Sequence, residues 1–199
     1  MKVLKTRNDG IEIIKLESTD DLQPYLTSFT EAYLDIFSGA PYFELFYTHE
    51  AQQILETNIQ AEDHITLLAL DKASNQGDKV IGIGFAVPLR ARPDVGRQLR
   101  GLIPIDHTFY LAELGIRPEY RRRGLGRELT LMRLEHISPD RFNHVVLRTS
   151  IEQDASQKMY AHLGFSDMGV YSEVTSRKLD GNIKTDHRLF LSRLIQTPH

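Results

Sequence analysis

The stretch Arg121-Arg122-Arg123-Gly124-Leu125-Gly126 decides how this chain is expected to fold. An apolar run at residues 109–116 precedes it, and apolar residues at helical spacing follow it from Leu125 to Leu134. The predicted order is therefore a strand, a basic glycine turn and a helix. Such a turn aims several backbone N–H groups and the positive end of the helix dipole at one point. An anion, most of all a phosphate, is the ligand expected there, and glycine at 124 and 126 leaves it room.

Two other interpretations of this stretch compete with a phosphate turn. Three consecutive arginines also suit a solvated face or a patch for polyanions, but the chain carries a net charge of −3, which argues against a nucleic-acid surface. A dinucleotide-binding loop needs a third glycine, and Leu129 stands where that glycine should fall. We therefore expect no nucleic-acid partner and no dinucleotide fold.

Together with Ile116-Arg117-Pro118, the basic turn resembles the acetyl-CoA-binding signature of the GCN5-related N-acetyltransferases (GNAT). In that family a strand ends in an aliphatic residue, one residue and Pro. Arg or Gln, two residues, Gly, one residue and Gly or Ala then follow. A second block, Met159-Tyr160-Ala161-His162-Leu163-Gly164-Phe165, resembles the late helix of the family, which ends in Gly-Phe. The resemblance covers residues 109–165 by motif and residues 11–87 only by the order of elements.

The resemblance implies an α/β fold, α+β in some schemes, with a central mixed and mostly antiparallel sheet. About seven strands, one splayed pair among them, and about four flanking helices are expected. The length of 199 residues suits one domain over 1–199, with residues 1–10 as a short N-terminal extension or an extra strand. Hydrophobic patterns predict strands at 2–5, 11–16, 65–70, 80–87, 109–116, 145–149, 168–179 and 187–194, and helices at 22–37, 50–60, 125–137 and 154–163.

Composition excludes several classes of site. The chain has no cysteine, so it has no disulfide, no thiolate metal ligand and no cysteine nucleophile. Its eight histidines show no paired ligand spacing, so no metal is predicted. No apolar run approaches the roughly 20 residues of a membrane helix, and the start of the chain lacks a secretory h-region. We expect a cytoplasmic protein with no membrane partner.

The resemblance assigns acetyl-CoA, as cosubstrate, to the splayed strand and the glycine turn. The end of the strand holds the pantetheine arm, and main-chain amides of the turn hold the pyrophosphate. The cofactor-binding residues implied in this way are Leu114, Gly115, Ile116, Arg121, Arg122, Arg123, Gly124, Leu125, Gly126, Arg127 and Gln153. Gln153 stands where some family members carry an asparagine that contacts the cofactor arm.

Two residues are candidates for the chemistry. The attacking amine must lose a proton, and Glu113, at the centre of an otherwise apolar strand, could accept it directly or through water. A solvent-facing position on an alternating strand is the other interpretation of Glu113, and both stay open. His107 and His162 are weaker candidates for the base, because single histidines are more often structural. The resemblance gives Tyr160 the role of donor to the departing thiolate, against the alternative of a packed core tyrosine.

The predicted function is an acetyl-CoA-dependent N-acetyltransferase. It would act on a primary amine of a small molecule or peptide by direct attack in a ternary complex, and a homodimer stays open. The alternative is a non-catalytic acyl-CoA-binding sensor. The connection Pro88–Asp106 carries four arginines and two aspartates, and a cationic loop beside the acceptor mouth would favour an acceptor with a carboxylate or phosphate.

Overall fold

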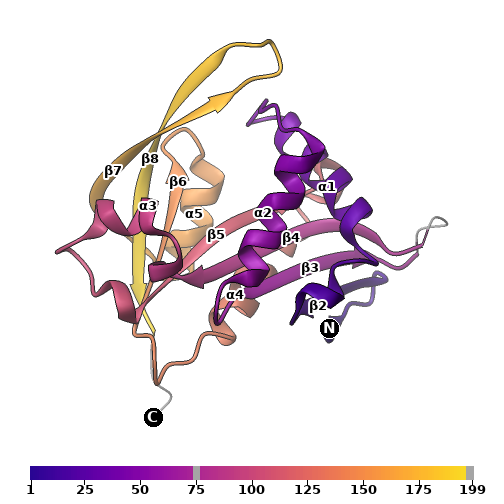
Figure 1. The fold of residues 1–199 in the computed structure, drawn as a ribbon, viewed down its shortest axis with the longest axis horizontal. Coiled ribbons are helices and arrows are strands. Elements are labelled where there is room, and N and C mark those ends of the chain that lie inside the picture. The colour runs from indigo at the N-terminus through magenta and orange to yellow at the C-terminus, as the bar shows by residue number, and fades with distance from the viewer. Residues whose placement is uncertain (74–76, 196–199) are drawn as a thin grey trace.

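A computed structural model describes residues 1–73 and 77–195, and over these residues one sheet of eight strands is flanked by five α-helices (Figure 1). The strands are β1 (Lys2–Thr6), β2 (Ile11–Leu16), β3 (Ile65–Asp71), β4 (Lys79–Pro88), β5 (Thr108–Ile116), β6 (His144–Ser150), β7 (Ser166–Arg177) and β8 (Ile183–Leu194). The helices are α1 (Leu26–Ser38), α2 (Thr48–Gln60), α3 (Pro93–Gly96), α4 (Leu125–Glu135) and α5 (Asp154–His162). The predicted mixed α/β fold is confirmed, with one strand more than expected and the short α3 as the additional helix.

The sheet order is β1-β2-β3-β4-β5-β6-β8-β7. Every neighbouring pair is antiparallel except β5 and β6, which are parallel. Strand β8 lies between β6 and β7, so the closing hairpin inserts its second arm into the sheet and leaves its first arm at the edge. The expected mostly antiparallel sheet with one parallel contact is therefore present.

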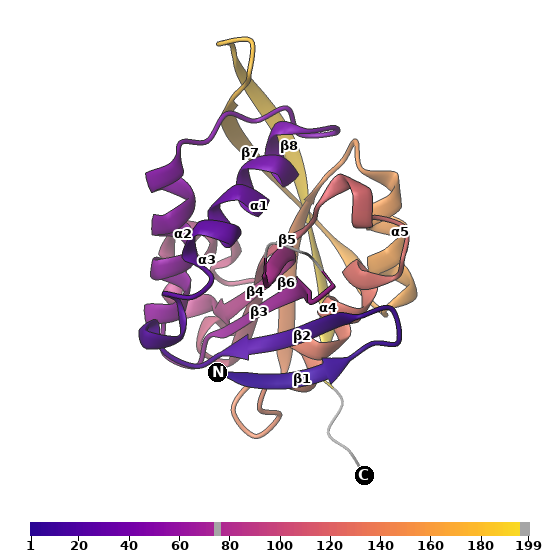
Figure 2. The ribbon, with the colours of Figure 1, turned by 90° about the vertical axis from the view of Figure 1, so that its right-hand side faces the viewer.

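Helices cover both faces of the sheet (Figure 2). On one face α1 and α2 bury an apolar cluster against β2, β3 and β4. On the other face α4 and α5 bury a second cluster, in which Leu125 and Leu129 of α4 meet Tyr160 of α5 and Leu163 just after it. Both helical spacings read from the sequence therefore face the core, since residues three or four apart share one side of a helix. No helix in the described part of the chain is long and apolar enough to cross a membrane.

Two elements differ most from their predicted bounds, by four residues each. Helix α1 begins at Leu26 and not at residue 22, because Pro24 disfavours helical backbone just before it, and residues Thr19–Asp21 form a separate 3-10 turn. Strand β8 begins at Ile183, four residues before its predicted start. Its first half is exposed and has no apolar alternation, yet its backbone pairs with β7 in a hairpin that projects from the body of the sheet (Figure 1).

Candidate active site

A cleft opens where β5 and β6 separate. The two strands pair only where Thr108–Tyr110 lies opposite His144–Val146. Beyond that point β5 follows β4 as far as Ile116, whereas β6 follows β8 as far as Ser150. The two strands splay toward their C-terminal ends, so one edge of β5 from residue 111 onward faces no strand. A cleft of about 560 Å³ lies there, which we call the cofactor cleft.

The basic glycine turn forms the end of this cleft. Gly124 has a φ of 80°, in the left-handed region, and is the N-cap of α4. Arg122 also has a positive φ, 65°. The first amides of α4 have no carbonyl of the helix to bond, and they carry the positive end of its dipole. The turn thus has the geometry of an anion site, as its sequence predicts.

The three arginines of the turn have three different roles. Arg121 donates to the carbonyl oxygens of Ile116 at 3.0 Å and Ala40 at 2.6 Å, which ties the turn to the end of β5 and to the segment after α1. Arg123 lies over the ring of Tyr120, 5.0 Å from its centroid, and turns away from the cleft. Arg122 is exposed and lines the cleft. Arg122 is therefore the arginine of the three whose side chain is left for an anion.

Most of the predicted cofactor residues come together in this one place. Those that line the cofactor cleft are Leu114, Gly115, Ile116, Arg121, Arg122, Gly126 and Gln153. Four others do not line it. Leu125 is buried in the core, Arg123 faces Tyr120, Gly124 caps the helix and Arg127 is exposed.

A β-bulge turns Glu113 into a second cleft. Phe85 of β4 pairs with Glu113 and the next residue, Ala86, pairs with Leu111, so Ala112 is the extra residue in β5. A bulge shifts the alternation of side chains by one. Glu113 consequently lines a cleft of about 600 Å³ between β5, α1, α2 and the β7–β8 hairpin, which we call the acceptor cleft.

The surroundings of Glu113 make it a stronger base than an ordinary glutamate. Glu113 is half-buried at the floor of the cleft, and the surrounding protein raises the pKa of its carboxyl group because the charged form loses water. Three cations, Arg92, Arg188 and Arg148, oppose that rise. A carboxylate with a raised pKa accepts a proton more readily near neutral pH, which is the property of a general base.

The side chain of Arg133, on α4, holds the backbone at the bulge. Its side chain is fully buried. Its Nη1 donates to the carbonyl oxygens of Phe85 and Glu113, both at 3.0 Å, and its Nη2 donates to Oγ1 of Thr130 at 3.1 Å. Burial lowers the pKa of the Arg133 guanidinium group, and the oxygens that accept its hydrogen bonds replace the water that the charged group has lost. No feature of the linear sequence distinguishes this arginine from a surface one.

Tyr160 lies where the two clefts approach each other. A third, smaller cavity of about 80 Å³ shares lining residues with each of the two clefts; we call it the channel, and Glu113, Tyr160 and Gln153 all line it. Burial raises the pKa of the Tyr160 hydroxyl, against the opposing effects of Arg133 and Thr130. The phenol therefore keeps its proton at neutral pH and can donate it. Both candidate catalytic residues, from β5 and α5, reach the same small space.

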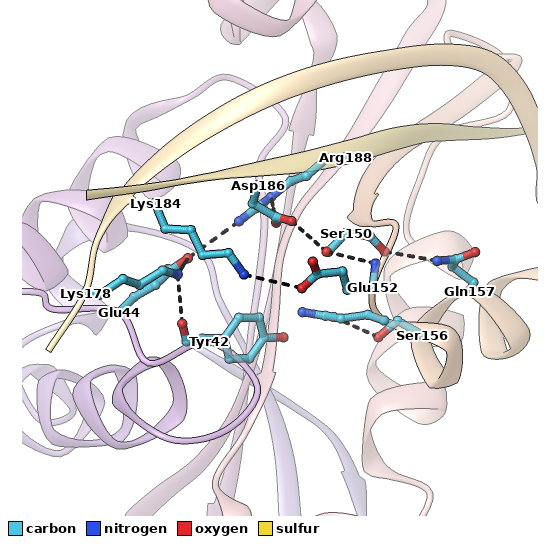
Figure 3. A network of polar contacts seen from close by, with 11 residues as sticks. Tyr42, Glu44, Ser150, Glu152, Ser156, Gln157, Lys178, Lys184, Asp186 and Arg188 are labelled. Carbon is cyan, nitrogen blue, oxygen red and sulfur yellow. Dashed lines mark hydrogen bonds and ion pairs between the residues drawn. The ribbon is translucent and has the colours of Figure 1, made fainter. Parts of the chain in front are cut away.

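Tyr42 is a residue of this site that the two sequence motifs do not identify. It follows α1 and lines both clefts and the channel. Its carbonyl accepts a hydrogen bond from Nζ of Lys178 at 2.8 Å, and Lys184 on the same hairpin pairs with Glu152 at 3.5 Å. Figure 3 shows these contacts joining the segment after α1, the β6–α5 loop and the β7–β8 hairpin around the channel. The ends of three segments that are distant in sequence thereby enclose the junction of the clefts.

Other candidates lie apart from this space. The Nδ1 atoms of His107 and His162 lie within hydrogen-bond distance of backbone carbonyls, and neither residue lines a cleft described above. Of the four arginines in the connection Pro88–Asp106, Arg92 lines the acceptor cleft. Within residues 1–73 and 77–195, no group of three or more His, Asp and Glu side chains is placed to hold a metal ion.

The sequence matches the model of the acetyltransferase (GNAT) family over residues 26–165. The chain belongs to the GNAT family. The resemblance seen in the two sequence motifs is thereby confirmed, and the GNAT match spans both of them. No curated protein matches the chain in sequence.

Solved structures with the GNAT fold are similar to this chain over almost the whole length of both. The ribosomal-protein-S18-alanine N-acetyltransferase from Escherichia coli is 16% identical, with a TM-score of 0.62 over 95% of this chain and 96% of that chain. Arabidopsis thaliana NAA60 in complex with acetyl-CoA is 14% identical, with a TM-score of 0.62 over 93% and 98%. A chain of the NatC complex bound to Gag peptide and CoA is 15% identical, with a TM-score of 0.60 over 92% and 99%. At these identities the likeness shows the fold.

Proposed function

We propose that this GNAT chain is an acetyl-CoA-dependent N-acetyltransferase that acts on a primary amine of a small molecule or peptide. The observation that carries the proposal is the channel between the two clefts, because Glu113 and Tyr160 both line it. A group held in the cofactor cleft and an amine held in the acceptor cleft would meet there. Holding two reactants in this way supports direct transfer in a ternary complex, since proximity and orientation supply much of the rate.

The cofactor cleft fits acetyl-CoA in two respects. Gly126 lines it without a side chain, and a Cβ at this position would stand 3.9 Å from Sδ of Met159 and 4.0 Å from Cδ2 of Leu114. The space beside the first amides of α4 is therefore open to a phosphate. The free edge of β5 from Leu114 to Ile116 offers backbone partners to the amides of a pantetheine arm.

The side chains at the channel divide the proton transfers between them. Acetyl-CoA, when bound, supplies the acetyl group as a thioester. Glu113 accepts a proton from the ammonium group of the acceptor, which leaves a nucleophilic amine. The Tyr160 hydroxyl would donate a hydrogen bond to the departing thiolate, and the second proton that the amine nitrogen loses on acetylation would protonate that thiolate or leave to solvent. Because the chain contains no cysteine, no acetyl-cysteine enzyme can form, which supports one-step transfer.

The decisive experiment measures CoA release by purified protein with acetyl-CoA and a panel of amino acids, polyamines, aminoglycosides and short peptides. The absence of cysteine helps, because a thiol-reactive dye then reports CoA alone. We expect release with a subset of the panel and strongly reduced release by Glu113→Gln and Tyr160→Phe. Tight binding of acetyl-CoA without release for any amine would instead favour the sensor.

The remaining expectations extend this proposal. We propose that residues 1–199 form one GNAT domain and that the cytoplasm is its compartment, because a cysteine-free enzyme that takes acetyl-CoA from solution suits that location. Whether the domain works as a homodimer is measured by light scattering during size-exclusion chromatography.

A further inference from the structure

Three arginines from three separate elements line the acceptor cleft around Glu113. Arg92 follows β4, Arg148 belongs to β6 and Arg188 belongs to β8. The register of β6 and β8 sets Arg188 opposite Ser150, so Arg148 and Arg188 are diagonal neighbours on one face of the sheet. Both also line the channel that Glu113 and Tyr160 share.

The acidic partners of these arginines are unequally distributed. Arg92 is held by Asp94 through two hydrogen bonds of 3.1 Å. Arg188 is held by Asp186 at 3.0 Å and approaches Glu44 at 3.7 Å, as Figure 3 shows. Arg148 is half-buried, and among the residues that the structure describes it has neither an ion pair nor a side-chain hydrogen bond. Its guanidinium group is the one that remains available to a ligand.

The carboxylates that line the acceptor cleft also differ in whether they have a partner of opposite charge. Glu44 lies within ion-pair distance of Lys178 at 3.6 Å and of Arg188, and Glu50 pairs with Arg177 at 2.7 Å. In the described part of the chain, Glu113 has no ion pair of its own. The channel wall therefore presents one carboxylate and one guanidinium group that are both left for the acceptor.

We propose that the acceptor is a small amino acid-like molecule whose carboxylate is bound by Arg148 while its amine faces Glu113. This proposal rests on the proposed acetyl transfer and names the substrate class of the same site. Arginine is suited to the role because its planar fork matches a carboxylate with two parallel hydrogen bonds. Arg92 and Arg188 add positive potential without losing their own partners. Because Glu113 and Arg148 line the same small channel, the amine and the carboxylate are separated by only a few bonds.

The apolar lining of the acceptor cleft indicates which part of such an acceptor remains free to vary. Tyr33, Phe37, Phe46, Ile54 and Phe85 form an apolar side of the cleft. A side chain of moderate size fits there, whereas a polyamine would bring a second cation toward the arginines. A peptide N-terminus has an amide where this acceptor has its carboxylate, so it would leave Arg148 unpaired.

The test compares L-amino acids with the matching L-amino-acid amides as acceptors, because the two differ in the carboxylate alone. Amides have the more weakly basic amine, so this effect favours the amide and opposes the expected result. We expect kcat/KM for the acids to exceed that for the amides by at least about tenfold, in keeping with a charge-assisted pair. Arg148→Gln should raise KM for the acids roughly 10- to 100-fold and leave KM for acetyl-CoA and for the amides unchanged.

Two further variants make the result specific. Arg148→Lys keeps the charge without the fork and should restore part of the affinity for the acids. Arg97→Gln removes an exposed arginine that does not line the cleft and should change nothing. Amides or polyamines turned over as well as acids, or an equal loss for acids and amides in Arg148→Gln, would overturn this proposal while leaving acetyl transfer intact. No amine-dependent release of CoA with any acceptor would overturn both.

Discussion

Replacing Gly126 by alanine should make the protein more stable with little effect on CoA binding, because the family signature has Gly or Ala at this position, whereas valine there should weaken CoA binding. Gly126 lies in the first turn of α4 and lines the cofactor cleft. A Cβ there meets Met159 and Leu114 only at ordinary van der Waals distance, 3.9 and 4.0 Å. Alanine is favoured over glycine in a helix by about 0.8–1.0 kcal/mol, and near the helix start we expect about half of this. That gain raises Tm by about 1–2 °C in a domain of this size.

The larger side chain of Gly126→Val would occupy the space beside the helix amides. We expect it to displace the pyrophosphate from at least one charge-assisted hydrogen bond of about 1.5–3 kcal/mol, which is a roughly 10- to 150-fold rise in Kd. Titration calorimetry with CoA and thermal melts of the free protein measure affinity and stability separately for both variants. Affinity for CoA should therefore be lost in Gly126→Val and kept in Gly126→Ala.

Gly124→Ala is the matched control two residues away. At a φ of 80° a Cβ costs about 1–2 kcal/mol in left-handed backbone, yet no atom lies within 4 Å of the position. Gly124 does not line the cofactor cleft. This variant should melt about 2–8 °C lower and keep most of its affinity for CoA. If Gly126→Val binds CoA like the wild type, or if Gly124→Ala loses more affinity than Gly126→Val, the location of the phosphate at this helix end is wrong.

Three more substitutions test the channel. The folded-state pKa of Glu113 is raised, so the stabilising contribution of this residue exists at low pH and disappears as pH rises through that pKa. Glu113→Gln should therefore raise Tm at neutral pH while nearly abolishing turnover. The acid limb of the wild-type kcat/KM profile should lie above pH 4.5. Tyr160→Phe should lower kcat about 100-fold with little change in KM for acetyl-CoA, and normal turnover would show that the hydroxyl only packs. Arg133→Met leaves the carbonyls of Phe85 and Glu113 without their hydrogen-bond donor and should lower the free energy of unfolding by about 3–5 kcal/mol in urea titrations. An unchanged urea midpoint would contradict the role of Arg133 at the bulge.

The cofactor side of the site could be predicted from sequence because its determinants are local. A strand, a turn with glycine at fixed positions and a helix start lie within about twenty consecutive residues, and backbone geometry alone aims the amides. The fold followed from the same motifs and from apolar periodicity. The beginning of β8 did not, because Ile183–Thr185 is exposed and its place in a strand depends on pairing with β7.

The acceptor side depends on contacts that no local pattern records. Nothing in Leu111-Ala112-Glu113 marks Ala112 as the extra residue, yet that bulge decides which side of the sheet Glu113 faces. The bulge is held by Arg133, twenty residues later, through a backbone carbonyl oxygen, a group that every residue has whatever its side chain. Sequence could therefore nominate Glu113 but could not choose between a solvent-facing and a cleft-facing carboxylate.

The arginines around Glu113 illustrate why the acceptor was the hardest part to foresee. In the sequence, the connection Pro88–Asp106 stands out for its charge, but Arg90 pairs with Glu62 and Asp63 away from the channel. Arg148 and Arg188 stand forty residues apart and meet because β8 inserts beside β6. Charge that recognises an acceptor is thus set by strand order and by which ion pairs are already satisfied. A substrate class for such an enzyme is best sought among the charged groups that the fold leaves without a partner.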